Sequence, residues 1–177
     1  RRLEDLSFGG DRLSARSFPG LALGARLVSL ARAGLRAHGE DPSQSIMVLR
    51  TVDGLYNILA QRGPFAPALV EATRQQALAL GFVPVYLPGV DPSLLDHGRL
   101  DEDLWIEAML EPGQTPQAVA ELQASWPLDV SAPTDNRPFF FYQNRARDLW
   151  AMLGHDDPHL LGNGLSVLLR VLLVALV

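Results

Sequence analysis

The residues with the most evident chemical potential lie in the stretch PTDNRPFFFYQ, which runs from Pro133 to Gln143. Asp135 and Arg137 place a carboxylate and a guanidinium two positions apart, just before three consecutive phenylalanines. A carboxylate accepts backbone N–H bonds in a local turn, and a guanidinium holds a second carboxylate through parallel hydrogen bonds. Two interpretations are open: a charged turn that anchors the aromatic run, which we favour, or a ligand cleft lined by Asp135 and Arg137.

Histidines and acids elsewhere offer weaker sites. The segment HDDPH, residues 155–159, mixes histidine with aspartate as some metal sites do, but Pro158 opposes a helix that would align the two histidines. We interpret it as a solvated loop and predict no metal site. His97 stands alone in a polar stretch. The acidic run LDEDLWIE, residues 100–107, could attract a polyamine cation, but a solvated helix face is the favoured interpretation.

Composition excludes several classes of protein. The net charge of −5 argues against a nucleic-acid partner, which would require a basic face. Cysteine is absent, which removes disulfides, thiol nucleophiles and cysteine-based zinc sites. All 15 basic residues are arginine, so a Schiff-base lysine and a lysine-containing phosphate loop are excluded as well.

Several secondary-structure elements must position these residues. The first ones that the sequence predicts are a strand, a helix and a hairpin. A turn at Gly9–Gly10 precedes a predicted strand over Arg12–Phe18. A helix is predicted over residues 21–39, with an apolar face made of Leu23, Leu27, Leu30, Ala31 and Leu35. Residues 43–52 predict a buried strand, and an Asp-Gly turn then joins it to residues 55–63 as an antiparallel neighbour.

The later elements complete a mixed α/β layer. A second helix is predicted over residues 64–81, with a face traced by Phe65, Leu69, Ala72, Gln76 and Leu80. Residues 82–89 predict a strand, and Pro84 marks it either as an edge strand or as the end of the strand. Short helices are predicted within an acidic, polar stretch from Asp91 to Trp126. This order favours an otherwise parallel sheet with an antiparallel edge.

An apolar run of thirteen residues, Leu165–Val177, comes after the charged segment, and only Ser166 and Arg170 interrupt it. As a helix it covers roughly 20 Å, whereas a bilayer core spans about 30 Å. We interpret it as the start of a transmembrane helix; a C-terminal core helix is the alternative. Arg145 and Arg147 lie before it and favour a cytoplasmic folded part.

The stretch APTDNRPFFFYQ resembles the TDDRPFFF signature of large prokaryotic membrane proteins related to spermidine synthase. Other pieces agree in order: LSFGGDRLSARSF is similar to the Pro-Gly-Gly strand entry of that family, and RGPFAPALVEATRQQALALGFVPVYLPG resembles its R-x-PF helix and the following strand. The segment ARLVSLARAGLRAHGEDPSQSIMVLR looks like its helix, Asp-Pro turn and strand. The resemblance spans most of Arg1 to Tyr142. Asn136 stands where the second acid is commoner, which removes one charge.

The resemblance implies a fold and a division of the chain. Residues 1–130 would be the C-terminal half of a Rossmann-like methyltransferase or spermidine synthase sheet domain with an antiparallel edge hairpin. Residues 131–157 would be a juxtamembrane linker, and residues 158–177 the start of a transmembrane helix. The partners implied are the lipid bilayer and the remainder of the same polypeptide, with the sheet domain on the cytoplasmic side of the cell membrane.

The activity implied is transfer of an aminopropyl or related alkyl group to an amine. The donor would be decarboxylated S-adenosylmethionine or S-adenosylmethionine, bound by the full-length protein and not by this segment alone. The main catalytic residues would lie upstream, with Asp135 and Arg137 as candidate substrate-binding residues. The alternative is a non-catalytic cytoplasmic binding or regulatory domain of a multi-spanning, transporter-like membrane protein.

The transmembrane interpretation makes a prediction about the native polypeptide beyond Val177. The apolar run should continue for about seven or more residues, because a bilayer core needs roughly 20. Sequencing of the native transcript checks this expectation. A stop codon or a charged cluster directly after Val177 would contradict it.

Overall fold

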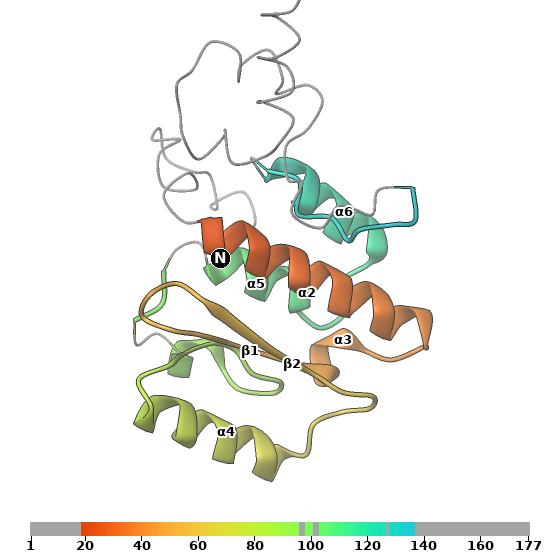
Figure 1. Ribbon diagram of the computed structural model, residues 1–177. Coiled ribbons are helices and arrows are strands. Elements are labelled where there is room, and N and C mark those ends of the chain that lie inside the picture. Colours follow the sequence, from red (N-terminus) through yellow and green to blue (C-terminus); the bar gives the residue numbers. More distant parts are fainter. Residues whose placement is uncertain (1–18, 96–97, 101–102, 127, 137–177) are drawn as a thin grey trace, which may run out of the picture.

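A computed structural model describes residues 19–95, 98–100, 103–126 and 128–136 (Figure 1). The elements in chain order are α2 (Pro19–Ala37), α3 (Pro42–Ser45), β1 (Ile46–Arg50), β2 (Tyr56–Ala60), α4 (Pro67–Ala79), β3 (Val83–Tyr86), a 3₁₀ turn η2 (Pro92–Leu95), α5 (Asp103–Leu110) and α6 (Pro116–Ser125). The described part of the chain is therefore a mixed α/β structure.

The predicted hairpin is confirmed. β1 and β2 pair antiparallel, with Ile46 opposite Ala60 and Arg50 opposite Tyr56. Gly54 in the connecting turn has a φ of 84°, a left-handed conformation that glycine adopts without steric cost. The Asp-Gly signal thus located the turn correctly.

The prediction of a mainly parallel sheet is wrong for the described strands. Their order is β2-β1-β3, and β1 pairs antiparallel with both neighbours. β2 and β3 consequently run parallel to each other and are joined through α4, as a strand–helix–strand unit requires, but β1 occupies the place between them. β2, α4 and β3 thus form a strand–helix–strand unit, but local sequence signals do not predict that β1 lies between its two strands.

The prediction of an edge strand around Pro84 is confirmed. β3 lies at one edge of the described sheet, where a residue without an N–H is tolerated. The ladder between β1 and β3 also shifts register between Val48 and Leu49. The proline and the irregular register mark β3 as a protected edge.

The sheet separates two apolar cores. α2, α5 and α6 lie on one side of it and α4 on the other (Figure 1). All five residues of β1 are buried: Ile46 and Val48 join the core with α2 and α5, whereas Met47 and Leu49 join the core with α4. Alternation along a strand places successive side chains on opposite faces, so this central strand contributes to both cores.

The predicted helix over residues 21–39 is confirmed as α2, but its predicted apolar face is wrong in part. Leu27 and Leu30 are 37% and 43% exposed. The helix instead buries its small residues against the sheet and, on an adjoining stripe, polar side chains. The buried members are Ala22, Ala25, Arg26, Val28, Ser29, Arg32 and Leu35.

The face predicted for the second helix is also wrong. α4 buries Val70 and Ala77, two turns apart, while Leu69 and Leu80 are 48% and 63% exposed. Pro67 occupies the first turn as expected, and its missing N–H costs nothing there. The apolar residues of this helix are too evenly distributed around its axis for periodicity to identify the buried face.

The stretch from Asp91 to Trp126 contains both predicted short helices, α5 and α6. Thr115 caps α6 by accepting a hydrogen bond from the backbone N–H of Ala118 at 3.1 Å. Trp105 and Trp126 are buried and meet edge to face with ring centroids 4.8 Å apart. This acidic stretch thus supplies a large part of the core above the sheet.

Several predictions fall outside the described residues. They are the strand over Arg12–Phe18, the aromatic run after Pro138 and the apolar run Leu165–Val177. Within the part of the chain that the structure describes, no helix is long and apolar enough to cross a membrane.

Two glycines of α2 give a matched test of its packing on β2. A Cβ at Gly24 would lie 2.5 Å from Cδ2 of Tyr56, whereas one at Gly34 would meet nothing within 4 Å. Gly24→Ala should lower the free energy of unfolding by about 1–3 kcal/mol through overpacking. Gly34→Ala should raise it by about 0.5–1 kcal/mol through helix propensity.

Urea denaturation of the full chain, followed by tryptophan fluorescence, measures both changes. Equal effects of the two substitutions would show that α2 does not pack on Tyr56 as described.

Candidate functional site

The most concentrated group of charges in the described chain is buried, at the carboxyl end of β1. Arg50 donates from Nε to Asp103 at 3.1 Å and from Nη2 to Asp103 Oδ2 at 3.0 Å. The side chains are 4% and 0% exposed. A pair this deeply buried is stable only if further hydrogen bonds offset its lost hydration.

Those further hydrogen bonds are present. Tyr56 donates its hydroxyl to Asp103 Oδ1 at 2.7 Å, and the backbone N–H of Leu100 donates to Oδ2 at 2.9 Å. Arg50 Nη2 also donates to the carbonyl of Gly98 at 2.7 Å. A carboxylate offers about four lone-pair positions, and these donors occupy them. Asp103 therefore has no capacity left for a substrate or a cation.

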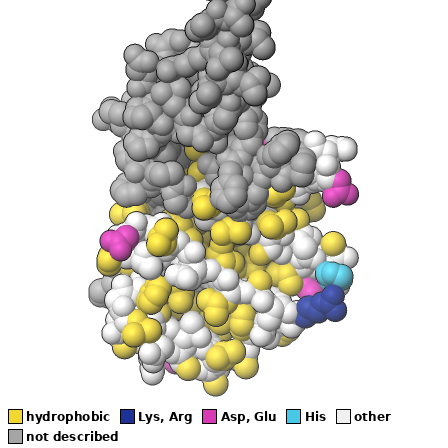
Figure 2. Space-filling model, in the orientation of Figure 1, with side chains coloured by type: hydrophobic (Ala, Val, Ile, Leu, Met, Phe, Trp, Pro, Cys, Tyr) yellow, Lys and Arg dark blue, Asp and Glu magenta, His cyan; other side chains and the backbone are white. Residues whose placement is uncertain are grey.

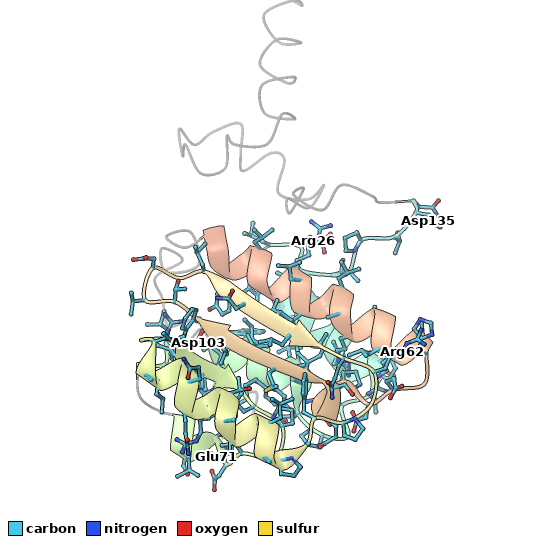
Figure 3. The ribbon with its side chains drawn as sticks, turned by 60° about the horizontal axis from the view of Figure 1, so that its bottom comes forward. Arg26, Arg62, Glu71, Asp103 and Asp135 are labelled. Carbon is cyan, nitrogen blue, oxygen red and sulfur yellow. The ribbon has the colours of Figure 1, made fainter. Side chains whose placement is uncertain are left out.

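The local fold explains why these residues meet. Tyr56 lies directly across the hairpin from Arg50, so both side chains are on the same face of the sheet. Asp103 is the first residue of α5, where the helix dipole favours a negative charge. Strand, hairpin and helix thus converge on one carboxylate, and the backbone at Gly98 and Leu100 is fixed beside it (Figure 3).

A second ion pair lies on α5 one turn further on. Arg99 Nη2 donates to Glu107 Oε2, and the two side chains are 6% and 14% exposed. Together with Asp103, this shows that the two described acids of the run do not lie on a solvated helix face; Asp101 and Glu102 fall outside the described residues. Arginines hold both described acids, so neither is available to a polyamine cation.

Arginines also tie α2 to the far end of α5. Arg32 donates from Nε to the carbonyl of Met109 at 3.0 Å and from Nη2 to that of Gln114 at 3.1 Å. Arg36 donates to the same Gln114 carbonyl at 2.7 Å. Burial lowers the pKa of Arg32 from its ordinary value, and the neighbouring charge of Arg36 lowers it further. Cations at this position complement the negative end of the α5 dipole.

The structure places one of the two predicted site residues. Asp135 is exposed, in a turn at the end of the described chain, and Figure 3 shows it well apart from Asp103. Arg137 lies outside the described residues, so the predicted pairing of this motif stays a prediction.

The described histidine does not form a site with acids. His38 is exposed and lies 3.4–3.5 Å from Nη2 of Arg62. His97 and residues 155–159 fall outside the described residues. Among the residues that are described, no group of three histidines and acids could hold a metal ion.

Sequence reasoning missed Arg50, Tyr56 and Asp103 as a unit. One signal was present: Arg50 closes the apolar strand IMVLR, and a guanidinium in a buried strand needs a carboxylate partner. The partner is 53 residues away, and several acids lie at that range, so the sequence alone does not select Asp103.

Comparison of the chain with models of known protein families, with curated proteins and with solved structures finds no match.

The buried cluster predicts a stability effect that an exposed pair lacks. Asp103→Ala leaves the Arg50 guanidinium buried without its partner and should lower the free energy of unfolding by about 3–5 kcal/mol. The double substitution Arg50→Met with Asp103→Leu should cost less than Asp103→Ala, because it removes both charges.

Glu71→Gln is the control, because Glu71 pairs with Arg74 on the exposed surface of α4 and should leave the urea midpoint nearly unchanged. If Asp103→Ala unfolds at the same urea concentration as Glu71→Gln, the cluster does not stabilise the fold.

Proposed function

We propose that the described α/β unit is the supporting half of a methyltransferase-like domain in a membrane-anchored protein related to spermidine synthase. The order helix, hairpin, helix, strand agrees with the family pieces that the sequence resembles. The antiparallel hairpin of β1 and β2 is compatible with this proposal, because the resemblance implies an antiparallel hairpin in that domain. In this proposal the unit supports the domain and supplies none of its catalytic groups.

One observation carries this assignment: the buried acid of α5, Asp103, has its acceptor positions filled, and the half-buried Glu107 is paired with an arginine. Asp103 accepts from Arg50, Tyr56 and Leu100, and Glu107 pairs with Arg99. General acid–base chemistry and amine binding both need a carboxylate with spare hydrogen-bonding capacity. These two acids therefore act in folding.

The acids of α5 and Asp135 do not offer what an adenosyl-sulfonium cofactor needs. Such a cofactor needs a glycine-rich loop that lets the nucleoside approach the backbone, and an acid for its ribose hydroxyls. In the described ranges the buried acids of α5 are occupied, and Asp135 is exposed and remote from them. Transfer of an aminopropyl or related alkyl group would therefore depend on other parts of the polypeptide.

A second function, a non-catalytic binding or regulatory domain on a transporter-like membrane protein, is favoured by one surface feature. Val52, Leu55 and Leu59 are 78%, 63% and 41% exposed, all on the β1–β2 hairpin. Hydrophobic side chains are visible over much of the face in Figure 2. A cluster of exposed apolar side chains marks a contact surface more often than a catalytic one.

Calorimetric titration separates the two functions. The full-length parent protein should bind S-adenosylmethionine or its decarboxylated form if the transferase proposal holds, and should give no heat of binding if it is a regulatory domain. The 177-residue chain alone should give no heat in either case. Saturable binding by the chain alone would overturn the proposal that this half supplies no cofactor site.

Arg137→Ala distinguishes a membrane-proximal turn from a ligand cleft. We expect the substitution to lower the thermal midpoint of the full-length protein in detergent, while its affinity for the cofactor stays within about twofold. Arg62→Ala, an exposed arginine near the end of α2, is the matched control and should change neither quantity. Lost cofactor binding in a normally folded Arg137→Ala protein would assign Arg137 to the cleft.

A further inference from the structure

The turn between β1 and β2 contains the single Asp-Gly sequence of the chain, Asp53–Gly54. Gly54 has no side chain to hinder its backbone nitrogen, so this nitrogen can attack the side-chain carboxyl carbon of the residue before it. Asp53 is exposed, so water, the second reactant, has free access to it. These two residues thus supply what a spontaneous isomerisation of aspartate requires, without an enzyme or a cofactor.

The isomerisation consists of two steps. In the first, the nitrogen of Gly54 bonds to Cγ of a protonated Asp53 carboxyl group, and the amide proton leaves with the carboxyl hydroxyl group as water. The product is a five-membered succinimide ring. In the second step, water cleaves the bond between that nitrogen and the main-chain carbonyl carbon of Asp53. The main chain then runs through Cβ and Cγ as an isoaspartate, whereas cleavage of the other ring bond to the nitrogen restores aspartate.

Three hydrogen bonds hold the turn closed and oppose the first step. Gly54 N donates to Thr51 O at 3.0 Å, and Thr51 N donates to Leu55 O at 2.9 Å. Leu55 N donates to Thr51 Oγ1 at 3.0 Å. Because ring closure removes the proton from the nitrogen of Gly54, the bond from that nitrogen to Thr51 O has to break first. The reaction therefore requires the turn to open.

The turn is poorly anchored compared with the strand that leads into it. Val52 and Leu55 are 78% and 63% exposed, and Asp53 between them is exposed as well. All five residues of β1, in contrast, are buried. Segments with few buried apolar contacts open locally at a lower free energy than the whole fold needs to unfold. The turn can therefore open while the sheet stays folded.

We propose that Asp53 is a site of spontaneous isomerisation to isoaspartate, and that local opening of the turn between Thr51 and Leu55 controls the rate. The product adds a methylene group to the main chain of the turn, which displaces the hydrogen bonds that close it. Arg50 and Tyr56 flank the turn and both bind Asp103. Isomerisation should therefore also weaken the buried cluster. This proposal does not depend on the proposed function.

Peptide mapping of the full chain, after incubation at physiological temperature and mildly acidic pH, measures isoaspartate at position 53. The native chain should form it on the order of 10-fold more slowly than the same chain unfolded in urea, because only the opened turn reacts. Asn163–Gly164 can form the same ring with loss of ammonia, so the digest has to separate that sequence from the peptide that contains Asp53.

Two threonines provide a matched pair of variants. Thr51 and Thr115 each accept a hydrogen bond from a backbone N–H through Oγ1, at 3.0 Å and 3.1 Å, but Thr115 caps α6 and not the turn. Thr51→Ala should speed isoaspartate formation in the native chain about fivefold, the effect of one lost hydrogen bond, and should leave the rate in urea unchanged. Thr115→Ala should leave both rates unchanged, because it does not release the turn.

Four outcomes would overturn the proposal. Equal rates in the native and the unfolded chain would show that the turn controls nothing. An unchanged native rate in Thr51→Ala would show the same for its hydrogen bond. Equal acceleration by both substitutions would assign the reaction to global unfolding. No isoaspartate at position 53 of the native chain, while the unfolded chain converts, would show that the turn does not open. If Thr51→Ala fails to fold, the native and unfolded rates of the unsubstituted chain and of Thr115→Ala decide.

Discussion

The buried pair of Arg50 and Asp103 is the constraint on which the rest of the described structure depends. It joins the carboxyl end of the central strand to the first turn of α5, and Tyr56 brings the hairpin to the same carboxylate. Moving both charges out of water costs several kcal/mol per ion in general, so the geometry around them must be nearly ideal. That requirement fixes β1, β2, α5 and the backbone at Gly98 in one arrangement.

Arginine serves this purpose better than lysine, and this chain uses only arginine. A guanidinium is planar and presents five N–H donors, so one side chain can bridge carboxylates and carbonyls from different elements. Arg50 binds a carboxylate and the Gly98 carbonyl, and Arg32 binds two carbonyls at and beyond the end of α5. Arg99 adds a third, nearly buried tie through Glu107. Arginines thus connect the elements around the core that α2, α5 and α6 form on one side of the sheet.

Features that depend on local sequence signals could be predicted from the sequence, whereas those that depend on long-range contacts of arginines could not. Helices, the hairpin turn and the edge strand with Pro84 depend on local signals, and their predictions are confirmed. The predicted apolar face of α2 is wrong in part, because periodicity places Leu27 in the core, whereas the helix buries Arg32, whose acceptor carbonyls are about 80 residues away. The predicted strand arrangement is wrong for the same reason, because long-range packing determines the position of β1 between β2 and β3. The Arg50–Asp103 partnership, 53 residues apart, belongs to this non-local class as well.

Saturation of the buried charges also separates folding from function within this chain. A carboxylate that already accepts hydrogen bonds from a guanidinium, a phenol and a backbone amide has its acceptor positions occupied and is held in one place, which suits a structural role and opposes reversible amine binding. Asp135 is in the opposite situation, because it is exposed in a turn and Figure 3 shows it well apart from Asp103. Its motif is one of the ordered segments that resemble the family, yet Asp135 is exposed and belongs to neither of the two apolar cores. Because the core does not use this acid, replacing Asp135 leaves the buried hydrogen bonds of Arg50 and Arg32 intact, so the role of Asp135 is separate from the stability of the sheet.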